Sequence, residues 1–181
     1  MKKVYIIAFM AFALAFSTEA VAQEFSGLDK SPMDISSYPP IHDGSDVAVR
    51  VTYSRPQLKG RSLSELTPSG KVWRTGANEA TEITFYKDVN FGGKDIKAGT
   101  YSLFTIPGEN EWTVVLNKNL NQWGAYSYEE GADVARVKVP NGSDGNSLEE
   151  FSIAFKKTDK GANMVMGWDK TRVAVPITMQ M

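Results

Sequence analysis

The segment richest in side chains capable of chemistry is residues 71–81, which lies between two stretches with strand-like alternation. It combines an aromatic ring, a guanidinium, an amide and a carboxylate, contributed by Trp73, Arg74, Asn78 and Glu79. Arginine presents a planar fork of donors to a carboxylate or phosphate group, and an indole offers a face for stacking. Because the apolar residues here have no regular period, we expect a polar loop on a rigid scaffold, where binding residues commonly lie.

The same loop also permits a purely structural interpretation, which the sequence leaves open. Trp73 would then lie in the core, Asn78 and Thr81 would satisfy loop backbone groups, and the charged side chains would pair with neighbours. In the binding interpretation, Arg55 at the end of the preceding strand converges with Arg74 on one anionic group.

A second candidate stretch, residues 121–128, is rich in aromatic rings and amides. Apolar sugar faces stack on aromatic rings, and sugar hydroxyls pair with amides, so Trp123 and Tyr126 could form a saccharide platform. Alternatively, the loop folds over the core, and the rings of Trp123 and Tyr126 are buried against it. The candidate ligand-binding residues are therefore Arg55, Trp73, Arg74, Asn78, Glu79, Thr81, Trp123 and Tyr126.

The inventory of catalytic residue types is small. Cysteine is absent and His42 is the only histidine, which removes thiol chemistry and histidine-rich metal sites. We assign no catalytic residue, no metal ligand and no cofactor. A hydrolase could still use paired carboxylates, such as Glu79 with another acid, and this alternative stays open.

The elements that must position these residues are short strands. Apolar and polar side chains alternate through residues 47–54, 82–86, 134–139 and 151–156, and apolar residues recur at every second position through 112–116, 164–168 and 173–177. Residues 101–106 are instead apolar on both faces, which predicts a central strand. Glycine, asparagine and aspartate separate these runs, as in residues 92–93, 141–145 and 169–170. The pattern predicts an all-β, single-domain antiparallel β-sandwich, of jelly-roll or immunoglobulin-like type. At most one short helix is expected, at residues 62–66, where Ser62 and Glu65 have capping-box spacing.

The chain begins with the features of a secretion signal. Lys2 and Lys3 precede an unbroken apolar run over residues 4–16, and an Ala-Val-Ala sequence at residues 20–22 matches a cleavage site. We therefore predict a signal peptide over residues 1–22, an irregular lead-in over residues 23–46 and the sandwich over residues 47–181. The expected location is periplasmic or extracellular, with no membrane span after cleavage. Without residues 1–22 the chain has 18 basic and 20 acidic side chains, so we do not expect a nucleic-acid partner.

Seven motifs occur in one order along the chain: YSRP at 53–56, KGR at 59–61, KVWRTGANEAT at 71–81, AGTYSLFTIP at 98–107, EWTV at 111–114, NQWGAY at 121–126 and WDKTRVAVPI at 168–177. Through them the chain resembles a family of secreted bacterial proteins, abundant in Bacteroidetes, that is classed as a domain of unknown function. The resemblance covers residues 31–177. It implies an exported β-rich domain and supplies no catalytic residues.

Three functions remain as hypotheses at this point. The first is a non-catalytic domain that binds a small anionic or sugar-like ligand. The alternatives are the carboxylate-dependent hydrolase and an envelope module with a structural or protein-interaction role.

Overall fold

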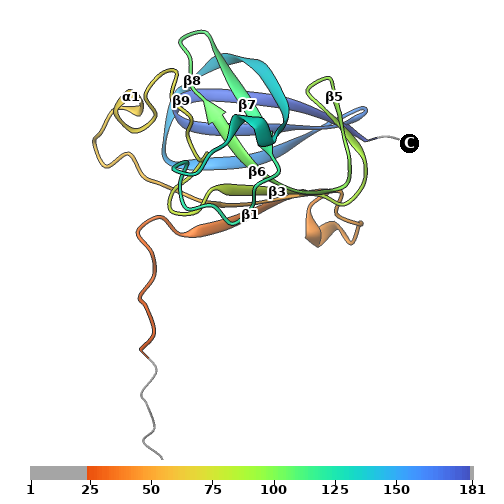
Figure 1. Ribbon diagram of the computed structural model, residues 1–181, viewed down its shortest axis with the longest axis horizontal. Helices are drawn as coiled ribbons and strands as arrows, with labels where there is room; N and C mark the ends of the chain where they lie inside the picture. Colours follow the sequence, from red (N-terminus) through yellow and green to blue (C-terminus); the bar gives the residue numbers. More distant parts are fainter. Residues whose placement is uncertain (1–23, 180–181) are drawn as a thin grey trace, which may run out of the picture.

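The computed structural model describes residues 24–179 and consists almost entirely of antiparallel strands (Figure 1). The strands are β1 (Met33–Tyr38), β2 (Val49–Ser54), β3 (Thr81–Phe85), β4 (Val89–Phe91), β5 (Lys94–Ile96), β6 (Gly99–Ile106), β7 (Glu111–Asn117), β8 (Asp133–Thr158) and β9 (Gly161–Met179). The helical elements are α1 (Leu63–Leu66) and the 3-10 turns η1 (Ile41–Asp43) and η2 (Glu130–Ala132). The predicted all-β fold is confirmed.

The strands form one sheet in the order β1-β2-β3-β6-β7-β8-β9-β4-β5, which folds into two layers. The long strand β8 belongs to both layers, because residues 133–140 pair with β7 and residues 141–158 pair with β9. Rings from the two layers meet in the interior, where Tyr53 of β2 packs edge-on against Phe151 of β8 and Phe85 of β3 against Phe91 of β4. One hydrophobic core therefore lies between the layers.

Strand β6 lies between β3 and β7, and its residues 102–105 are buried on both faces. Leu103 faces the main core, whereas Phe104 joins Val115 and Ala80 in a second, smaller cluster on the opposite face. Val72, Ala125 and other partly buried residues pack over this second cluster. The loops around residues 72–80 and 120–128 thus cover the outer face of β6 and β7, which holds them in place.

Two local features of the structure follow directly from residue types in the sequence. Helix α1 has the expected capping box, in which the backbone N–H of Ser62 donates to Glu65 Oε2 over 2.7 Å. The β4–β5 connection is a tight hairpin at Gly92 and Gly93, whose φ angles are 57° and 89°. Both central residues need φ above zero in this type of turn, which glycine adopts at little cost.

Three expected boundaries differ from the structure. The lead-in is not irregular throughout, because Met33–Tyr38 forms β1 and pairs with all of β2. Residues 141–145 do not end a strand: β8 continues through them, and register shifts between Ser143, Leu148 and Ser152 absorb the extra residues. Residues 169–170 likewise lie within β9, where Asp169 takes a φ of 46°. Bulges of this kind contain the residue types of turns without ending the pairing.

The predicted signal peptide and its cleavage site lie outside the described residues. Within residues 24–179, no helix has the length and apolar character needed to cross a membrane. The described residues that precede β1 extend outwards from the body of the fold (Figure 1).

Candidate functional site

The two candidate loops are joined to each other by backbone hydrogen bonds. The N–H of Ala80 donates to the carbonyl of Gln122 over 2.8 Å, and the N–H of Gly124 donates to the carbonyl of Asn78 over 2.9 Å. Between these bonds, Glu79 and Trp123 form an isolated antiparallel bridge. The sequence predicted two polar loops separately, and the structure combines them into one short ladder.

Unusual backbone conformations concentrate in this ladder. Five non-glycine residues of the described chain have positive φ, and three of them lie here: Thr75 at 56°, Asn78 at 59° and Asn121 at 56°. Asparagine tolerates this region, but a β-branched threonine in it is a genuine outlier. Thr75 is fully buried, and its hydroxyl donates to Thr105 Oγ1 over 3.2 Å. Strain of this kind persists where the surroundings enforce it and is found at binding sites.

Trp73 anchors the first loop in the main core. Its indole stacks on Trp168 with ring centroids 5.5 Å apart and meets Phe151 edge-on at 5.0 Å. Its Nε1–H donates to the carbonyl of Gly76 over 3.1 Å. This is the structural role considered for Trp73, so most of its ring face is not available for a ligand.

Arg74 lies beside a hollow of about 270 Å³ that is lined by Val72, Trp73, Arg74, Ala125 and Tyr126. Its Nε is buried and has no hydrogen-bond partner, and Nη1 reaches only the carbonyl of Asn78, at 3.5 Å. In the part of the chain that the structure describes, no carboxylate pairs with this guanidinium. A cation that lines a hollow and has no carboxylate partner makes this place a candidate anion site.

Gly124 allows Arg74 and Tyr126 to approach each other. Its φ is 70°, and a Cβ at this position would stand 2.9 Å from Arg74 Nη1 and 2.8 Å from Tyr126 Cε2. Both groups therefore lie against the glycine backbone, and any larger residue would push them apart. The sequence pointed to Gly124 only as a place for close approach, because the identity of the approaching groups depends on the tertiary fold.

Trp123 and Tyr126 do not plug the core. Their exposed fractions are 60% and 84%, respectively, so both rings are open to solvent beside the ladder. Instead, Gln122 and Gly124 are the buried residues of this loop, and Tyr128 packs edge-on against Phe104 with centroids 5.1 Å apart. Tyr126 thus lines the Arg74 hollow with an exposed ring, and Trp123 is exposed in the same loop.

Arg55 is not part of this site. Its guanidinium donates to the carbonyl of Phe151 from Nε at 3.1 Å and to Ser152 Oγ from Nη2 at 2.8 Å. Nη1 pairs with Asp34 Oδ2 at 3.1 Å. All three guanidinium nitrogens of Arg55 thus have partners within the protein, so Arg55 does not share an anion with Arg74.

The remaining candidates have separate positions. The Thr81 hydroxyl is buried and donates to the carbonyl of Thr75 over 2.7 Å, which is a structural role. The backbone N–H of Ser31 and, second, the side-chain amide of Asn78 lower the pKa of Asp29, which places Asn78 beside the leading segment. Glu79 is exposed and lines a second hollow of about 170 Å³ together with Glu82 and Asn121.

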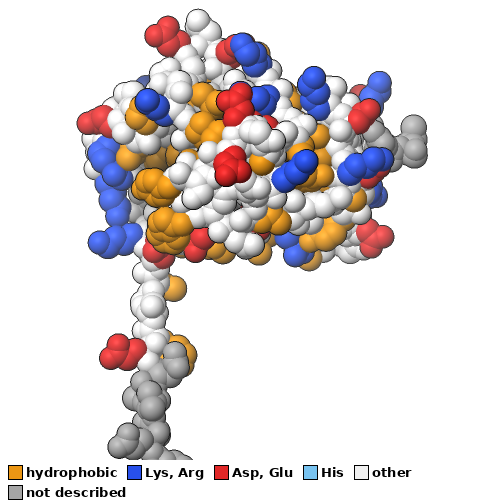
Figure 2. All heavy atoms as spheres, in the orientation of Figure 1, with side chains coloured by type: hydrophobic (Ala, Val, Ile, Leu, Met, Phe, Trp, Pro, Cys, Tyr) orange, Lys and Arg blue, Asp and Glu red, His pale blue; other side chains and the backbone are white. Residues whose placement is uncertain are grey.

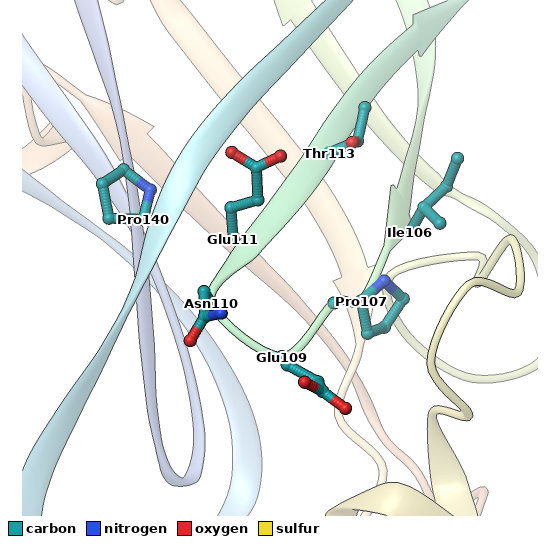
Figure 3. Close-up of a pocket in the computed structure, with 8 residues that line it drawn as sticks. Ile106, Pro107, Glu109, Asn110, Glu111, Thr113 and Pro140 are labelled. Atoms are coloured by element: carbon teal, nitrogen blue, oxygen red, sulfur yellow. The ribbon is translucent and has the colours of Figure 1, made fainter.

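A larger hollow of about 570 Å³ lies at the β6–β7 hairpin (Figure 3). The carboxylates of Glu109 and Glu111 point away from each other there, and Glu111 Oε1 pairs with Lys138 Nζ at 2.6 Å. This hollow offers open space without a convergent set of polar groups, so the Arg74 hollow is the better candidate. Among residues 24–179, no group of three or more histidine and acidic side chains is placed to hold a metal ion.

Comparisons with known proteins identify the family of this chain, but they assign no role to the residues of the candidate site. Comparison with curated proteins and with solved structures gives no match. A family model described as "Protein of unknown function (DUF2911)" matches residues 36–177, from within β1 to two residues before the end of β9. The chain therefore belongs to the DUF2911 family.

Proposed function

We propose that this domain binds a small ligand that carries a carboxylate next to a ring, in the hollow between Arg74 and Tyr126. The observation that carries this proposal is the buried Nε of Arg74, which has no partner within the described chain. The same guanidinium lines an open hollow and has no carboxylate partner among the described residues, so a carboxylate bound there would supply the missing counter-charge.

The chemistry of the guanidinium favours a carboxylate. Nε and the adjacent Nη form a planar fork that matches the two oxygens of a carboxylate. The positive charge is local, because acidic and basic side chains are interspersed over the face shown in Figure 2. Recognition would therefore depend on this one arginine and not on a broad basic surface.

The hollow suits a ligand of about one ring. Its volume of about 270 Å³ lies just below the range of small-molecule sites, which span roughly 300–1,000 Å³. The exposed ring of Tyr126 offers a face against which an apolar ring surface can stack. As part of the same proposal, the chain is exported and meets its ligand in the periplasm or outside the cell.

Titration calorimetry with residues 23–181 tests this function. The probes are glucuronate and benzoate as ring carboxylates, acetate as a carboxylate without a ring, and glucose as a neutral ring. We expect both ring carboxylates to bind, and Arg74→Met to abolish their binding. The matched control is Lys71→Met, which removes an exposed cation three residues away and should leave binding unchanged.

A second readout follows the guanidinium itself. The Nε–H resonance of Arg74 should shift in nitrogen–proton spectra when glucuronate is added, because its hydrogen-bond state changes. The proposal is wrong if no ring carboxylate binds, or if Arg74→Met and Lys71→Met weaken binding equally.

A further inference from the structure

We infer that the ligand is an acidic disaccharide unit, in which one uronic acid sugar is joined to a neutral sugar. The acidic sugar would occupy the Arg74 hollow, and the neutral sugar would lie across Trp123 in the hollow beside Glu79. This inference rests on the proposed function and specifies its ligand.

The two hollows adjoin the same ladder. Glu79 and Trp123 stand opposite each other in an antiparallel bridge, so their side chains project to the same face. Asn121 lines the second hollow and Ala125 the first, with Trp123 between them in the chain. Trp123 lines neither hollow, but its exposed indole lies on the same face as Glu79, where a ligand that extends from the Arg74 hollow towards Glu79 can stack on it.

The second hollow offers hydrogen-bond acceptors. Glu82 Oε1 accepts the backbone N–H of Asn121 at 3.1 Å, and Oε2 has no partner among the described residues. The exposed Glu79 carboxylate also lacks a partner within residues 24–179. Sugar hydroxyls are donors that suit such acceptors, and the carboxylate–hydroxyl bond is charge-assisted.

Charge determines the order of the two sugars. An anion fits beside the unpaired Arg74, but two carboxylates in the second hollow would repel a second acidic sugar. The pattern therefore favours one acidic and one neutral unit over a chain that is acidic at every unit. This distinguishes the inferred ligand from a polyuronate.

A peptide fits these features less well. An extended peptide is commonly bound by adding a strand to a free sheet edge. In the ladder, the N–H groups of Ala80 and Gly124 are already bonded across the two loops. The available surface consists of ring faces and carboxylates, which suits a saccharide.

The test compares four probes by calorimetry: methyl glucuronoside, a glucuronosyl–glucose disaccharide, digalacturonate and the dipeptide Ala-Asp. We expect the mixed disaccharide to bind about tenfold more tightly than the monosaccharide, as one added stacking contact implies. Digalacturonate should bind no better than the monosaccharide. Glu79→Gln should strengthen digalacturonate binding, because it removes one repelling charge.

Variants separate the two halves of the site. Trp123→Ala should remove the tenfold gain of the disaccharide and leave monosaccharide binding within about twofold, since the lost contact is one stacked ring. Leu120→Ala, a change in the same loop at a residue that is also exposed, is the matched control and should alter neither affinity.

Equal affinity for monosaccharide and mixed disaccharide would overturn the inference while the proposed function stands. Tighter binding of digalacturonate or of the dipeptide than of the mixed disaccharide would also overturn it. If methyl glucuronoside itself does not bind, the proposed function fails and the inference fails with it.

Discussion

The hydroxyl of Tyr53 hydrogen-bonds both backbone groups of Ile153, accepting from the N–H at 3.0 Å and donating to the carbonyl at 3.3 Å. Tyr53 belongs to β2 and Ile153 to β8, and these strands are not paired with each other. The phenol thus satisfies the edge of β8 that faces away from β9. Arg55, two residues later, does the same for the carbonyl of Phe151. Side chains of Tyr53 and Arg55 therefore bridge the seam, by which we mean the line where β2 of one layer meets the unpaired edge of β8 in the other. They protect a strand edge that would otherwise be free.

Tyr53→Phe should lower the free energy of unfolding by about 1–3 kcal/mol, because it leaves a buried N–H and carbonyl unsatisfied. Chemical denaturation measures the loss, and amide exchange at Ile153 should accelerate. Tyr101→Phe is the control, since its hydroxyl makes one exposed bond to the Lys97 carbonyl. An equal loss of unfolding free energy in the two variants would show that the Tyr53–Ile153 hydrogen bonds stabilise the fold no more than an exposed tyrosine hydrogen bond does.

The two arginines of the binding hypothesis should respond differently to removal of charge. Arg55→Met loses three hydrogen-bonded groups and should cost about 1–3 kcal/mol of stability. Arg74→Met removes a guanidinium with an unsatisfied donor, so its stability should stay within about 1 kcal/mol of the parent. Thermal and denaturant unfolding measure the change in stability of each variant relative to the parent. A large loss for Arg74→Met would mean that this residue is a structural element.

Gly124→Ala should weaken ring carboxylate binding and cost about 1–2 kcal/mol of stability. The stability cost arises because alanine is disfavoured at positive φ. The binding loss has a second cause, since the new Cβ would displace Arg74 and Tyr126. Gly70→Ala is the matched control, because Gly70 has a φ of 72° and a Cβ there would meet nothing within 4 Å, so it should cost stability without weakening binding. Calorimetry and thermal unfolding of both variants provide the comparison, and unchanged ligand affinity in Gly124→Ala would contradict this account.

A pH effect should arise at Tyr128. Burial and, second, the hydrogen bond to Asp133 raise the pKa of Tyr128 from 10.0 to about 12. Above pH 10 the unfolded chain loses this proton while the folded chain keeps it, so the stabilising contribution falls as the pH rises towards 12. The difference in melting temperature between the parent and Tyr128→Phe should be constant below pH 10 and narrow above it. A difference that stays constant up to pH 12, or full ionisation of Tyr128 at pH 10, would contradict this expectation.

Alternation in the sequence predicted most of the fold, because most strands have one face towards the core and one towards solvent, and the apolar run over residues 101–106 marked β6, which is buried on both faces. It missed β1, where two prolines follow the strand and half of its residues are polar. It also divided β8 and β9 at residues 141–145 and 169–170. Asparagine, glycine and aspartate mark a bulge as readily as a turn, and only the partner strand decides between them.

The candidate site stays a prediction, and the structure changes which residues can belong to it. The binding hypothesis brought Arg55 together with Arg74, whereas the structure engages Arg55 with Phe151, Ser152 and Asp34. Whether a cation has a partner depends on which strands meet in space, as the contact with Asp34 of the unexpected strand β1 shows. The hydrolase alternative for Glu79 and the envelope-module alternative stay predictions.

The arrangement of the four tryptophans gives this protein a built-in pair of optical reporters. Trp73, Trp112 and Trp168 form one interior cluster, whereas Trp123 stands alone in solvent at the candidate site. A collisional quencher such as acrylamide should reach the solitary indole first, and a bound guest should shield it. Emission from the interior trio should change only when the two layers separate. Occupancy and unfolding can therefore be followed in one unlabelled sample.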